Sequence, residues 1–416
     1  MDNSQRTKGT RPQDLRARNS LLILQELSQT AGQTINELSE KLHLSRTAVQ
    51  NIIFFLQQEG LIADGGKRDS TSFGGKRAIF YRMRSDYKHS IFFYLSSQII
   101  IAELYDFSLA RLMYRMGDVS QLSYSDLLQH IVKMTQSLLR DAGILQSDVY
   151  GIAIAVSGTV DSDKGVLIGL TGDNYPEKWG TNLSMVQDLH DQLDMDADIY
   201  LDNMCNFSGL NSYVSLVENE VSSCLYVMAH SRGIGAAFIR NGRIDKGLHG
   251  LLGEIAHTTI SYESSFPCRC GRKGCFEAML YPDAVRRQTN AAIRKMDPCG
   301  LEIDSVNSMD DLLRKANEEN PCAIQEVTHL AGLFAQLLYN AQIMGDPACI
   351  IFHDSFSVQC DYFHHALLSA CGEKSKGHLE VPIRLFFDTE SFSERVRKGA
   401  ALFLRNRYFD QFTQNL

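Results

Sequence analysis

The sequence predicts a mixed α/β protein in which a small, mainly helical module precedes a much larger body. Three closely spaced amphipathic helical segments lie between residues 19 and 56. From about residue 89 onward, short apolar strand segments alternate with amphipathic helical segments, which is typical of α/β folds. The charge divides at the same place. Residues 1–90 contain 14 Lys and Arg against 9 Asp and Glu, although the whole chain has a net charge of -8.

The composition is that of a folded protein with several domains. The 416 residues are 44% hydrophobic and 22% charged, and a chain of this length is expected to form two to four domains. No apolar run reaches the roughly 20 residues needed to cross a bilayer, and the basic N-terminus lacks the apolar stretch of a secretory signal. We therefore expect a cytoplasmic protein that does not bind a membrane. A basic module ahead of an acidic body suits a nucleic-acid partner for the small end.

The N-terminal helices have the spacing of a helix-turn-helix. Leu21, Leu24 and Leu27 repeat at helical spacing in the first helix. Thr34 and Glu37 form a capping-box pattern that opens the second helix, which breaks at residues 43–44. Ser45 is placed to cap the third helix, whose predicted buried face consists of Val49, Ile52, Ile53 and Leu56.

The third helix and the segment after it predict a DNA-reading surface. Arg reads guanine and Gln or Asn reads adenine in the major groove, and each good pair discriminates by about 1 to 3 kcal/mol. Residues 61–62 and 78–83 look like the two strands of a wing with a polar loop between them. The predicted DNA-binding residues are Ser45, Arg46, Thr47, Gln50 and Asn51 on the helix and Lys67, Arg68, Lys76 and Arg77 on the wing. A helical hairpin with a β-ribbon that merely mediates contacts is the alternative.

The residues before the first helix form a basic arm. It carries Arg6, Lys8, Arg11, Arg16 and Arg18. Such an arm either contacts phosphate and the minor groove or is a solvated tail.

The body begins with a predicted hairpin over residues 91–95 and 99–104. A helix over 124–141 and a buried strand over 150–156 follow. Further strands are predicted at 199–202 and 224–229, and a long helix at 324–344. A C-terminal helix over 393–412 has one apolar face, which we expect to pack against the first part of the body rather than to form a dimer contact.

The cysteines predict a metal centre. All ten lie at or after Cys205, and three of them are Cys268, Cys270 and Cys275. Together with His257 they supply three thiolates and one imidazole, which is a complete tetrahedral set for structural zinc with no open position for a reacting water. Reduced cysteines without metal are the alternative reading.

Residues 229–277 resemble the ROK family of repressors, open reading frames and sugar kinases. The turn at Gly233 and Gly235, the Gly-Glu-Ile-x-His segment over residues 253–257, and the Cys-x-Cys-Gly-x-x-Gly-Cys-x-Glu segment over 268–277 occur in that family's order. The resemblance implies a winged helix-turn-helix followed by a two-lobed, actin-like (ribonuclease H-like) body. The implied domains are 1–86 for DNA binding with its arm, 87–203 for lobe 1 completed by the C-terminal helix 390–416, and 204–389 for lobe 2 with the zinc motif.

The resemblance also implies a sugar site between the lobes. Its implied sugar-binding residues are Asn203, Glu254, His257 and Glu277, with Asn174 and the Ser157-Gly158 turn as further candidates for the lining. In relatives the imidazole at the position of His257 also approaches the sugar, so zinc would hold the pocket in shape by fixing that ring.

Three departures from the family's kinases argue against catalysis. The resemblance places the kinase base at Met204, whose thioether cannot accept a proton, and Asp202 lies on an extended segment where neighbouring side chains point apart. The first phosphate loop, at residues 94–98, has neither the acid nor the glycine of the family. The glycine run expected after Ile351 reads Phe352-His353-Asp354-Ser355.

We therefore expect a sequence-specific transcription regulator, not an enzyme. The expected partners are double-stranded DNA and a sugar or sugar phosphate that relieves repression of carbohydrate genes, and the protein is expected to be a homodimer or homotetramer. Two alternatives stay open: an ATP-dependent sugar kinase with a displaced base, and a DNA-binding regulator whose sugar pocket is vestigial.

Overall fold

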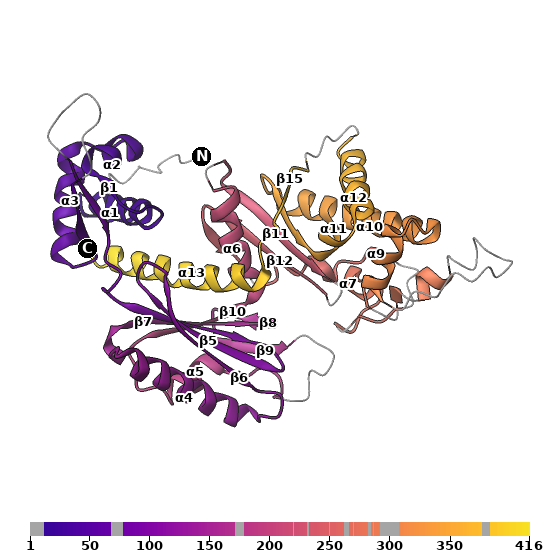
Figure 1. The fold of residues 1–416 in the computed structure, drawn as a ribbon, viewed down its shortest axis with the longest axis horizontal. Coiled ribbons are helices and arrows are strands. Elements are labelled where there is room, and N and C mark those ends of the chain that lie inside the picture. Colours follow the sequence, from indigo (N-terminus) through magenta and orange to yellow (C-terminus); the bar gives the residue numbers. More distant parts are fainter. Residues whose placement is uncertain are drawn as a thin grey trace, which may run out of the picture.

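The computed structural model describes residues 12–67, 78–170, 179–218, 220–230, 233–248, 250–261, 266–268, 270–281, 284–285, 287–291, 308–376 and 383–416 (Figure 1). A winged helix-turn-helix comes first, and a two-lobed α/β body follows, as the sequence predicts. Among the described helices, none combines the length and the apolar composition needed to cross a membrane.

The N-terminal module has three helices and a small antiparallel sheet. Its sheet has the order β1-β3-β2, with a wing formed by the last two strands. The elements are α1 (Pro12–Ser28), β1 (Gln33–Thr34), α2 (Ile35–Leu42), α3 (Arg46–Gln58), β2 (Ile62–Lys67) and β3 (Ile79–Met83). Strand β1 was not predicted, because two residues are too short to show a periodic pattern.

Local hydrogen bonds confirm the predicted helix boundaries. The Thr34 hydroxyl accepts the Glu37 N–H at 3.3 Å, and the Glu37 carboxylate accepts the Thr34 N–H at 2.7 Å. His43, in the left-handed region at φ 53°, ends α2. The Ser45 hydroxyl then accepts the Ala48 N–H at 3.2 Å at the start of α3. The predicted inner face of α3 is buried as expected.

The body contains two five-stranded sheets with the same strand order. In each, the first strand pairs antiparallel with the second and parallel with the fourth, the second pairs antiparallel with the third, and the fourth pairs parallel with the fifth. Lobe 1 uses β4 (His89–Leu95), β5 (Ile99–Asp106), β6 (Arg111–Asp118), β7 (Val149–Val156) and β10 (Asp198–Asn203). Lobe 2 uses β11 (Ser223–His230), β12 (Gly233–Arg240), β13 (Arg243–Asp245), β14 (Ile350–Asp354) and β15 (Leu385–Phe387).

The helix after each fifth strand crosses to the other lobe. Helix α6 (Met204–Leu216) leaves lobe 1 and packs on β11 and β12 of lobe 2, whereas α13 (Phe392–Gln414) leaves lobe 2 and packs on β4 and β7 of lobe 1. The two helices also pack on each other, and a Cβ at Gly399 of α13 would overlap the Phe207 carbonyl oxygen of α6. Glycine is therefore required at Gly399 for this close approach.

Helix α13 also carries the winged helix (Figure 1). The Arg405 guanidinium of α13 donates to the Ser28 carbonyl at the end of α1 at 3.4 Å, and Phe409 is buried together with apolar residues of α1 and α3. Near the end of α13, Phe412 stacks on Phe55 of α3. The face of α13 that was predicted to pack on the body does so, and the same helix also supports the N-terminal module.

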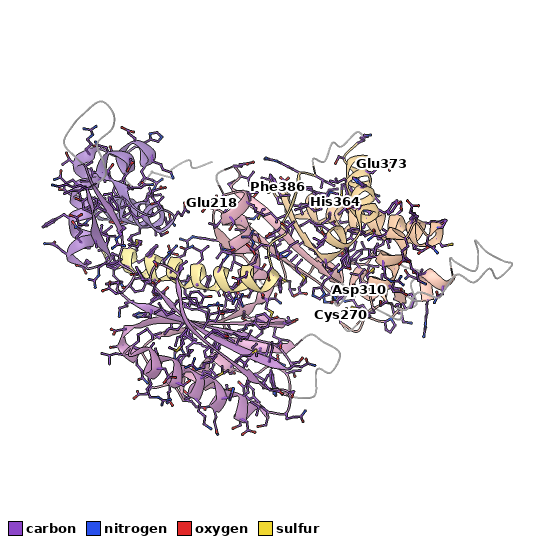
Figure 2. All side chains as sticks on the ribbon, in the orientation of Figure 1. Glu218, Cys270, Asp310, His364, Glu373 and Phe386 are labelled. Atoms are coloured by element: carbon purple, nitrogen blue, oxygen red, sulfur yellow. The ribbon has the colours of Figure 1, made fainter. Side chains whose placement is uncertain are left out.

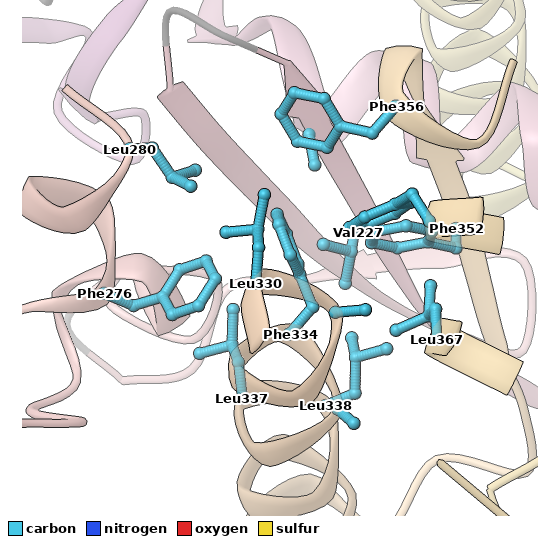
Figure 3. Packing of buried hydrophobic residues seen from close by; sticks show 14 of the residues in the cluster. Val227, Phe276, Leu280, Leu330, Phe334, Leu337, Leu338, Phe352, Phe356 and Leu367 are labelled. Carbon is cyan, nitrogen blue, oxygen red and sulfur yellow. The ribbon is translucent and has the colours of Figure 1, made fainter. Parts of the chain in front are cut away.

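The core of lobe 2 is built around aromatic rings (Figure 3). Phe334 meets the rings of Phe276, Phe352 and Phe363 at centroid distances of 4.7 to 5.6 Å.

The remaining elements of the body surround the two sheets. They are α4 (Tyr124–Ala142), η1 (Gln146–Asp148), β8 (Gly158–Asp161), β9 (Val166–Leu170), α5 (Met185–His190), η2 (Ile255–His257), α7 (Phe276–Met279), α9 (Met309–Asn317), α10 (Pro321–Gly345), α11 (Ser355–Gln359) and α12 (Asp361–Lys374).

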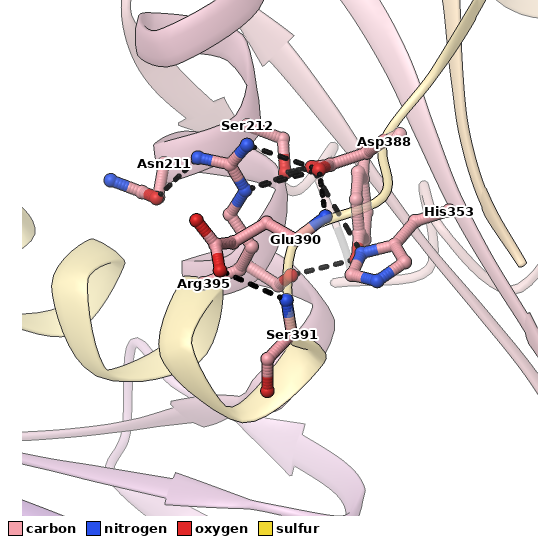
Figure 4. A network of polar contacts seen from close by, with 9 residues as sticks. Asn211, Ser212, His353, Asp388, Glu390, Ser391 and Arg395 are labelled. Carbon is pink, nitrogen blue, oxygen red and sulfur yellow. Dashed lines mark hydrogen bonds and ion pairs between the residues drawn. The ribbon is translucent and has the colours of Figure 1, made fainter.

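A buried polar network joins lobe 2 to both crossing helices (Figure 4). The Arg395 guanidinium of α13 donates to both oxygens of Asp388, and Asp388 also accepts the Ser212 hydroxyl of α6 at 2.6 Å. Arg395 further donates to the Asn211 side chain at 3.1 Å. Because every charge here is paired, the network fixes where α13 enters the body.

Candidate DNA-reading helix, metal centre and sugar pocket

The outer face of α3 presents hydrogen-bonding side chains to solvent. Arg46, Thr47, Gln50 and Asn51 are all exposed. From Arg46 to Asn51 the helix rises about 7.5 Å, close to the rise of two base pairs. This geometry suits insertion of the first turns of α3 into a major groove.

The other predicted DNA-binding residues lie at the start of α3, on the wing and in the N-terminal arm. Ser45 is exposed, but its hydroxyl accepts the Ala48 N–H as a helix cap. Lys67 is exposed at the end of β2, as a phosphate contact requires. The wing residues Arg68, Lys76 and Arg77 lie outside the described residues, as do Arg6, Lys8 and Arg11 of the arm. Arg16 belongs to α1, and its guanidinium lies 4.3 Å from the Phe55 ring centroid, so it is not part of a free tail.

The fold brings the four predicted metal ligands together at the edge of lobe 2, where Figure 2 labels Cys270. The ligand atoms of His257, Cys268, Cys270 and Cys275 all lie within 4.8 Å of one another. The Cys270 and Cys275 sulfurs are 3.6 Å apart, and the Cys268 sulfur is 3.4 Å from His257 Nδ1. Zn–S bonds of about 2.3 Å in a tetrahedron separate two sulfurs by about 3.8 Å, so the donor set fits a zinc ion.

The surroundings of the cluster oppose ionisation of Cys268 and Cys275 but favour that of Cys270. Burial, hydrogen bonding with Cys270 and the charge of Cys268 raise the pKa of Cys275 to about 12. Burial also raises the pKa of Cys268. At Cys270 burial has the same effect, but hydrogen bonds, including one from the Arg272 backbone, outweigh it and lower the pKa. A metal ion would have to displace these protons.

Three of the four predicted sugar ligands meet beside the metal cluster. His257 Nε2 lies 3.6 Å from a Glu254 oxygen, and His257 Nδ1 lies 3.8 Å from a Glu277 oxygen. Burial and the Glu277 charge raise the pKa of Glu254, and His257 partly offsets them. Two carboxylates flanking one imidazole form the type of polar wall that binds neighbouring sugar hydroxyls.

The position of Glu277 depends on a residue that the sequence analysis missed. The Tyr281 hydroxyl donates to Glu277 at 3.1 Å and lies 3.9 Å from the Cys268 sulfur. Tyr281 therefore links the carboxylate to the metal cluster. Its spacing of four residues after Glu277 is the signal that could have identified it.

Asn203 ends β10 on lobe 1, whereas the other three predicted sugar ligands lie on lobe 2. Its side-chain amide donates to the Gly158 carbonyl at 2.6 Å, and its side-chain oxygen accepts the Cys205 N–H at 2.7 Å as the cap of α6. The Ser157-Gly158 turn is thus adjacent to Asn203, as expected of a common lining. Asn174 lies outside the described residues.

The positions that correspond to kinase groups have other contacts here. Met204 is buried with Phe207 and residues of α13, and Asp202 is buried in an ion pair. The segment after Ile351 continues β14 into α11, and the His353 ring hydrogen-bonds Tyr226 at 2.8 Å.

The fold and these three sites define a class of protein: a winged helix mounted on a two-lobed body with duplicated strand order. Residues 16–63 match the family described as winged helix-turn-helix DNA-binding, and residues 111–404 match the ROK family. The chain belongs to the ROK family.

Known relatives include both regulators and kinases. The xylose repressor of Caldicellulosiruptor bescii is 24% identical over 379 residues, covering 86% of this chain and 88% of that protein. A crystal structure of a ROK family transcriptional regulator, a homologue of the E. coli MLC protein, superposes with a TM-score of 0.75 at 18% identity, covering 96% of this chain and 98% of that one. The ROK hexokinase of Thermus thermophilus gives 0.59 at 20% identity and covers 76% of this chain and 97% of its own. At these identities the solved structures show the fold alone.

Proposed function

We propose that this protein is a sequence-specific DNA-binding repressor of carbohydrate genes, and that a sugar or sugar phosphate bound between its lobes relieves repression. The observation that carries the proposal is the winged helix docked on α13, which joins the DNA-reading face to both lobes. A relative of similar length and overall alignment is named xylose repressor. A DNA partner also implies that the protein works in the cytoplasm.

The proposed sugar ligands come from both lobes, with Asn203 on lobe 1 and Glu254, His257 and Glu277 on lobe 2. A ligand held by both sides favours one angle between the lobes, and it shifts the equilibrium only by its differential affinity for the two arrangements. Because α13 contacts lobe 1, α6 and the winged helix, a change in lobe angle moves the DNA-reading helix. In a dimer this changes the spacing of two winged helices.

We assign a structural zinc ion to the site of His257, Cys268, Cys270 and Cys275. Bound there, zinc would supply a fixed tetrahedral anchor that holds the His257 ring and the loop around it. With the His257 ring held in this way, the neighbouring carboxylates of Glu254 and Glu277 would face a ligand. We also propose 1–86, 87–203 with 390–416, and 204–389 as the domains, which the crossing of α6 and α13 supports.

The DNA-binding half is tested with an operator selected from random duplex DNA. Arg46→Ala and Gln50→Ala should each cost about 1 to 3 kcal/mol of discrimination at one base position. Lys67→Ala should weaken binding to every sequence and reduce the salt dependence by about one phosphate contact. Gln58→Ala, an exposed change at the far end of α3, is the matched control and should bind as the wild type. If Arg46→Ala, Gln50→Ala and Lys67→Ala all reduced the affinity for every duplex equally, α3 would not be the element that reads the DNA sequence.

The sensing half is tested by thermal shift with pentoses, hexoses, amino sugars and their phosphates. A sugar at about 100 times its dissociation constant should add about 2.7 kcal/mol of stability. It should then weaken operator binding in a gel shift. A flat panel would support a vestigial pocket instead.

We further propose that the chain does not phosphorylate a sugar. Met204 cannot take the proton of an attacking hydroxyl, and the Asp202 carboxylate is occupied by Lys246. Incubation with radiolabelled ATP and the same sugars should give no sugar phosphate. Turnover that disappears in Asp202→Asn would establish the kinase alternative.

A further inference from the structure

An ion pair bridges the two lobes next to the candidate sugar site. Lys246 follows β13 of lobe 2, and its ammonium lies 3.0 Å from the Asp202 carboxylate at the end of β10 in lobe 1. The same ammonium donates to the Ser162 hydroxyl of the β8–β9 turn at 2.5 Å. The Asp202 side chain is 5% exposed and that of Lys246 is 23% exposed, so the pair is largely shielded from solvent.

On the lobe 1 side, the pair is tied to the proposed sugar ligand Asn203. The other oxygen of Asp202 accepts the Asn203 N–H at 2.8 Å and the Asn206 side chain at 2.7 Å. The Asn203 side chain in turn holds Gly158, the first residue of the hairpin that carries Ser162. Asp202, Asn203 and the hairpin therefore form one hydrogen-bonded unit.

On the lobe 2 side, Lys246 begins the loop that ends in Glu254. The Lys246 carbonyl accepts the Leu252 N–H at 3.3 Å, and the Leu251 carbonyl accepts the Glu254 N–H at 3.1 Å. Within this loop Gly250, at φ 71°, approaches the Val160 carbonyl of the same hairpin, since a Cβ there would lie 3.8 Å from it. The loop thus contacts lobe 1 at both Lys246 and Gly250.

We propose that Lys246, paired with Asp202 and Ser162, is a positioning residue that sets the separation between the two halves of the sugar site. The inference deepens the proposed function and rests on it. The pair holds lobe 1, with Asn203, at a fixed distance from lobe 2, with Glu254, and neither Lys246 nor Asp202 needs to touch the ligand. A shielded charge left without its partner is costly, so the pair favours the arrangement of the lobes in which Lys246 and Asp202 meet.

The test uses the full-length protein and two readouts. Hydrogen exchange without ligand reports opening of the 246–254 loop and the 158–170 hairpin. Titration with D-xylose, D-glucose, D-glucosamine and glucose 6-phosphate reports sugar affinity. Lys246→Met should raise exchange in both segments and weaken the binding of the responding sugar by about 10-fold or more. Lys246→Arg should keep both the hydrogen exchange of these segments and the sugar affinity closer to the wild-type values.

Two further variants separate positioning from general destabilisation. Asp202→Asn combined with Lys246→Met should be no worse than Lys246→Met alone, because both remove the same interaction. Lys164→Met is the matched control, because Lys164 lies in the same hairpin but pairs with Asp161 of its own lobe at an exposed position, and it should behave as the wild type. Should Lys246→Met fail to fold, Ser162→Ala, which removes only the hydroxyl contact, should show the same changes at smaller size.

Three outcomes would overturn the inference. They are unchanged exchange in Lys246→Met, faster exchange with unchanged sugar affinity, or an equal effect of Lys164→Met. If the wild type binds no sugar of the panel while Lys246→Met still opens the loop and hairpin, the effector part of the proposed function fails and the positioning role fails with it, although the inter-lobe contact stands.

Discussion

The two lobes have the same strand order, yet they are stabilised in different ways. In lobe 1 the third and fourth strands are joined mainly by α4, whose apolar face packs into a continuous core with the sheet. In lobe 2 the corresponding connection runs from residue 246 to 349 and holds the metal cluster as well as α9 and α10. Equal topology thus does not imply equal energetics.

The two lobes differ in the side chains that surround the connection between the third and fourth strands, which in lobe 2 contains the loop with Cys268 and Cys275. The buried apolar group around Cys268 and Cys275 has Ala278 as its only other buried member among the described residues. So small a cluster adds little to the burial of Ile255, Phe276 and Leu280, which anchor the two ends of this region in the main core of lobe 2. The proposed zinc ion would therefore add a local anchor to the packed core of lobe 2, whereas lobe 1 is held by side-chain packing and hydrogen bonds.

The largest expected effect is loss of the metal site. Cys275→Ser should release zinc and cost about 4 kcal/mol or more, a fall in the unfolding midpoint of roughly 8 to 16 °C, because the loop loses its anchor. Zinc content and thermal unfolding check this. Cys371→Ala, at a buried cysteine of α12, is the control and should keep its zinc. Wild-type protein without zinc would remove the proposed contrast between the lobes.

The next effect concerns pH and is expected in lobe 2. Burial raises the pKa of Asp354, at the end of the fourth strand, to about 6, whereas the fourth strand of lobe 1 ends in the uncharged Val156. The folded state therefore keeps a proton that the unfolded state loses near pH 4. The contribution of Asp354 to stability is present at low pH and is lost as pH rises through about 6, by up to about 3 kcal/mol.

Asp354→Asn should remove this dependence, since Asn can still cap α11. Urea unfolding at pH 4.5 and pH 7.5 measures it: the variant should gain stability relative to the wild type at the higher pH. Parallel profiles for the two proteins would refute the assignment.

A smaller effect tests the crossing helices that the lobes share. Gly399→Ala should cost about 2 kcal/mol, because the added Cβ meets the Phe207 carbonyl and α13 must shift away from α6. Gly372→Ala is a matched change in α12, where nothing lies within 4 Å of the new Cβ. It should instead stabilise by up to about 1 kcal/mol. Chemical denaturation of both variants gives the comparison, and a neutral Gly399→Ala would disprove the tight crossing.

The smallest effect tests lobe 1 alone. The Tyr124 hydroxyl of α4 donates to Asp188 of α5 at 2.7 Å. Tyr124→Phe should cost about 1 kcal/mol and leave the zinc content unchanged, because it removes one partly buried hydrogen bond far from the metal cluster. If zinc chelation and Tyr124→Phe lower the midpoint of one and the same unfolding transition by the same fraction, the two lobes do not differ in how they are stabilised.

Much of the winged helix was predictable because its signals are local. The capping box at Thr34 and Glu37 and the cap at Ser45 act within four residues, so a short stretch of sequence contains the whole interaction. The metal cluster was predictable for a similar reason, since three of its ligands lie within eight residues. His257 was added because its imidazole completes the donor set, with support from the family resemblance, since its position in the sequence is a weaker signal than the cysteine spacing.

Long-range pairs gave no such signal. Lys246 and Asp202 are 44 positions apart in the sequence and lie on different lobes. Asn211 and Arg395 form a hydrogen bond although most of lobe 2 lies between them in the sequence. Gly399 looks like an ordinary weak point in a helix until α6 is placed against it. The third strand of lobe 1, Arg111–Asp118, was missed because its side chains are mostly exposed and show little apolar pattern.

The sequence by itself determined the class of domains, the exposed outer face of α3 and the close spacing of Cys268, Cys270 and Cys275, since each depends on side chains a few residues apart. Only the tertiary structure decided that α6 and α13 exchange lobes, that α13 carries the winged helix, and that Lys246 joins the lobes beside Asn203. These features depend on which surfaces meet when the sheets close against their helices. That choice is made by shape and burial summed over the whole chain, which no local pattern records.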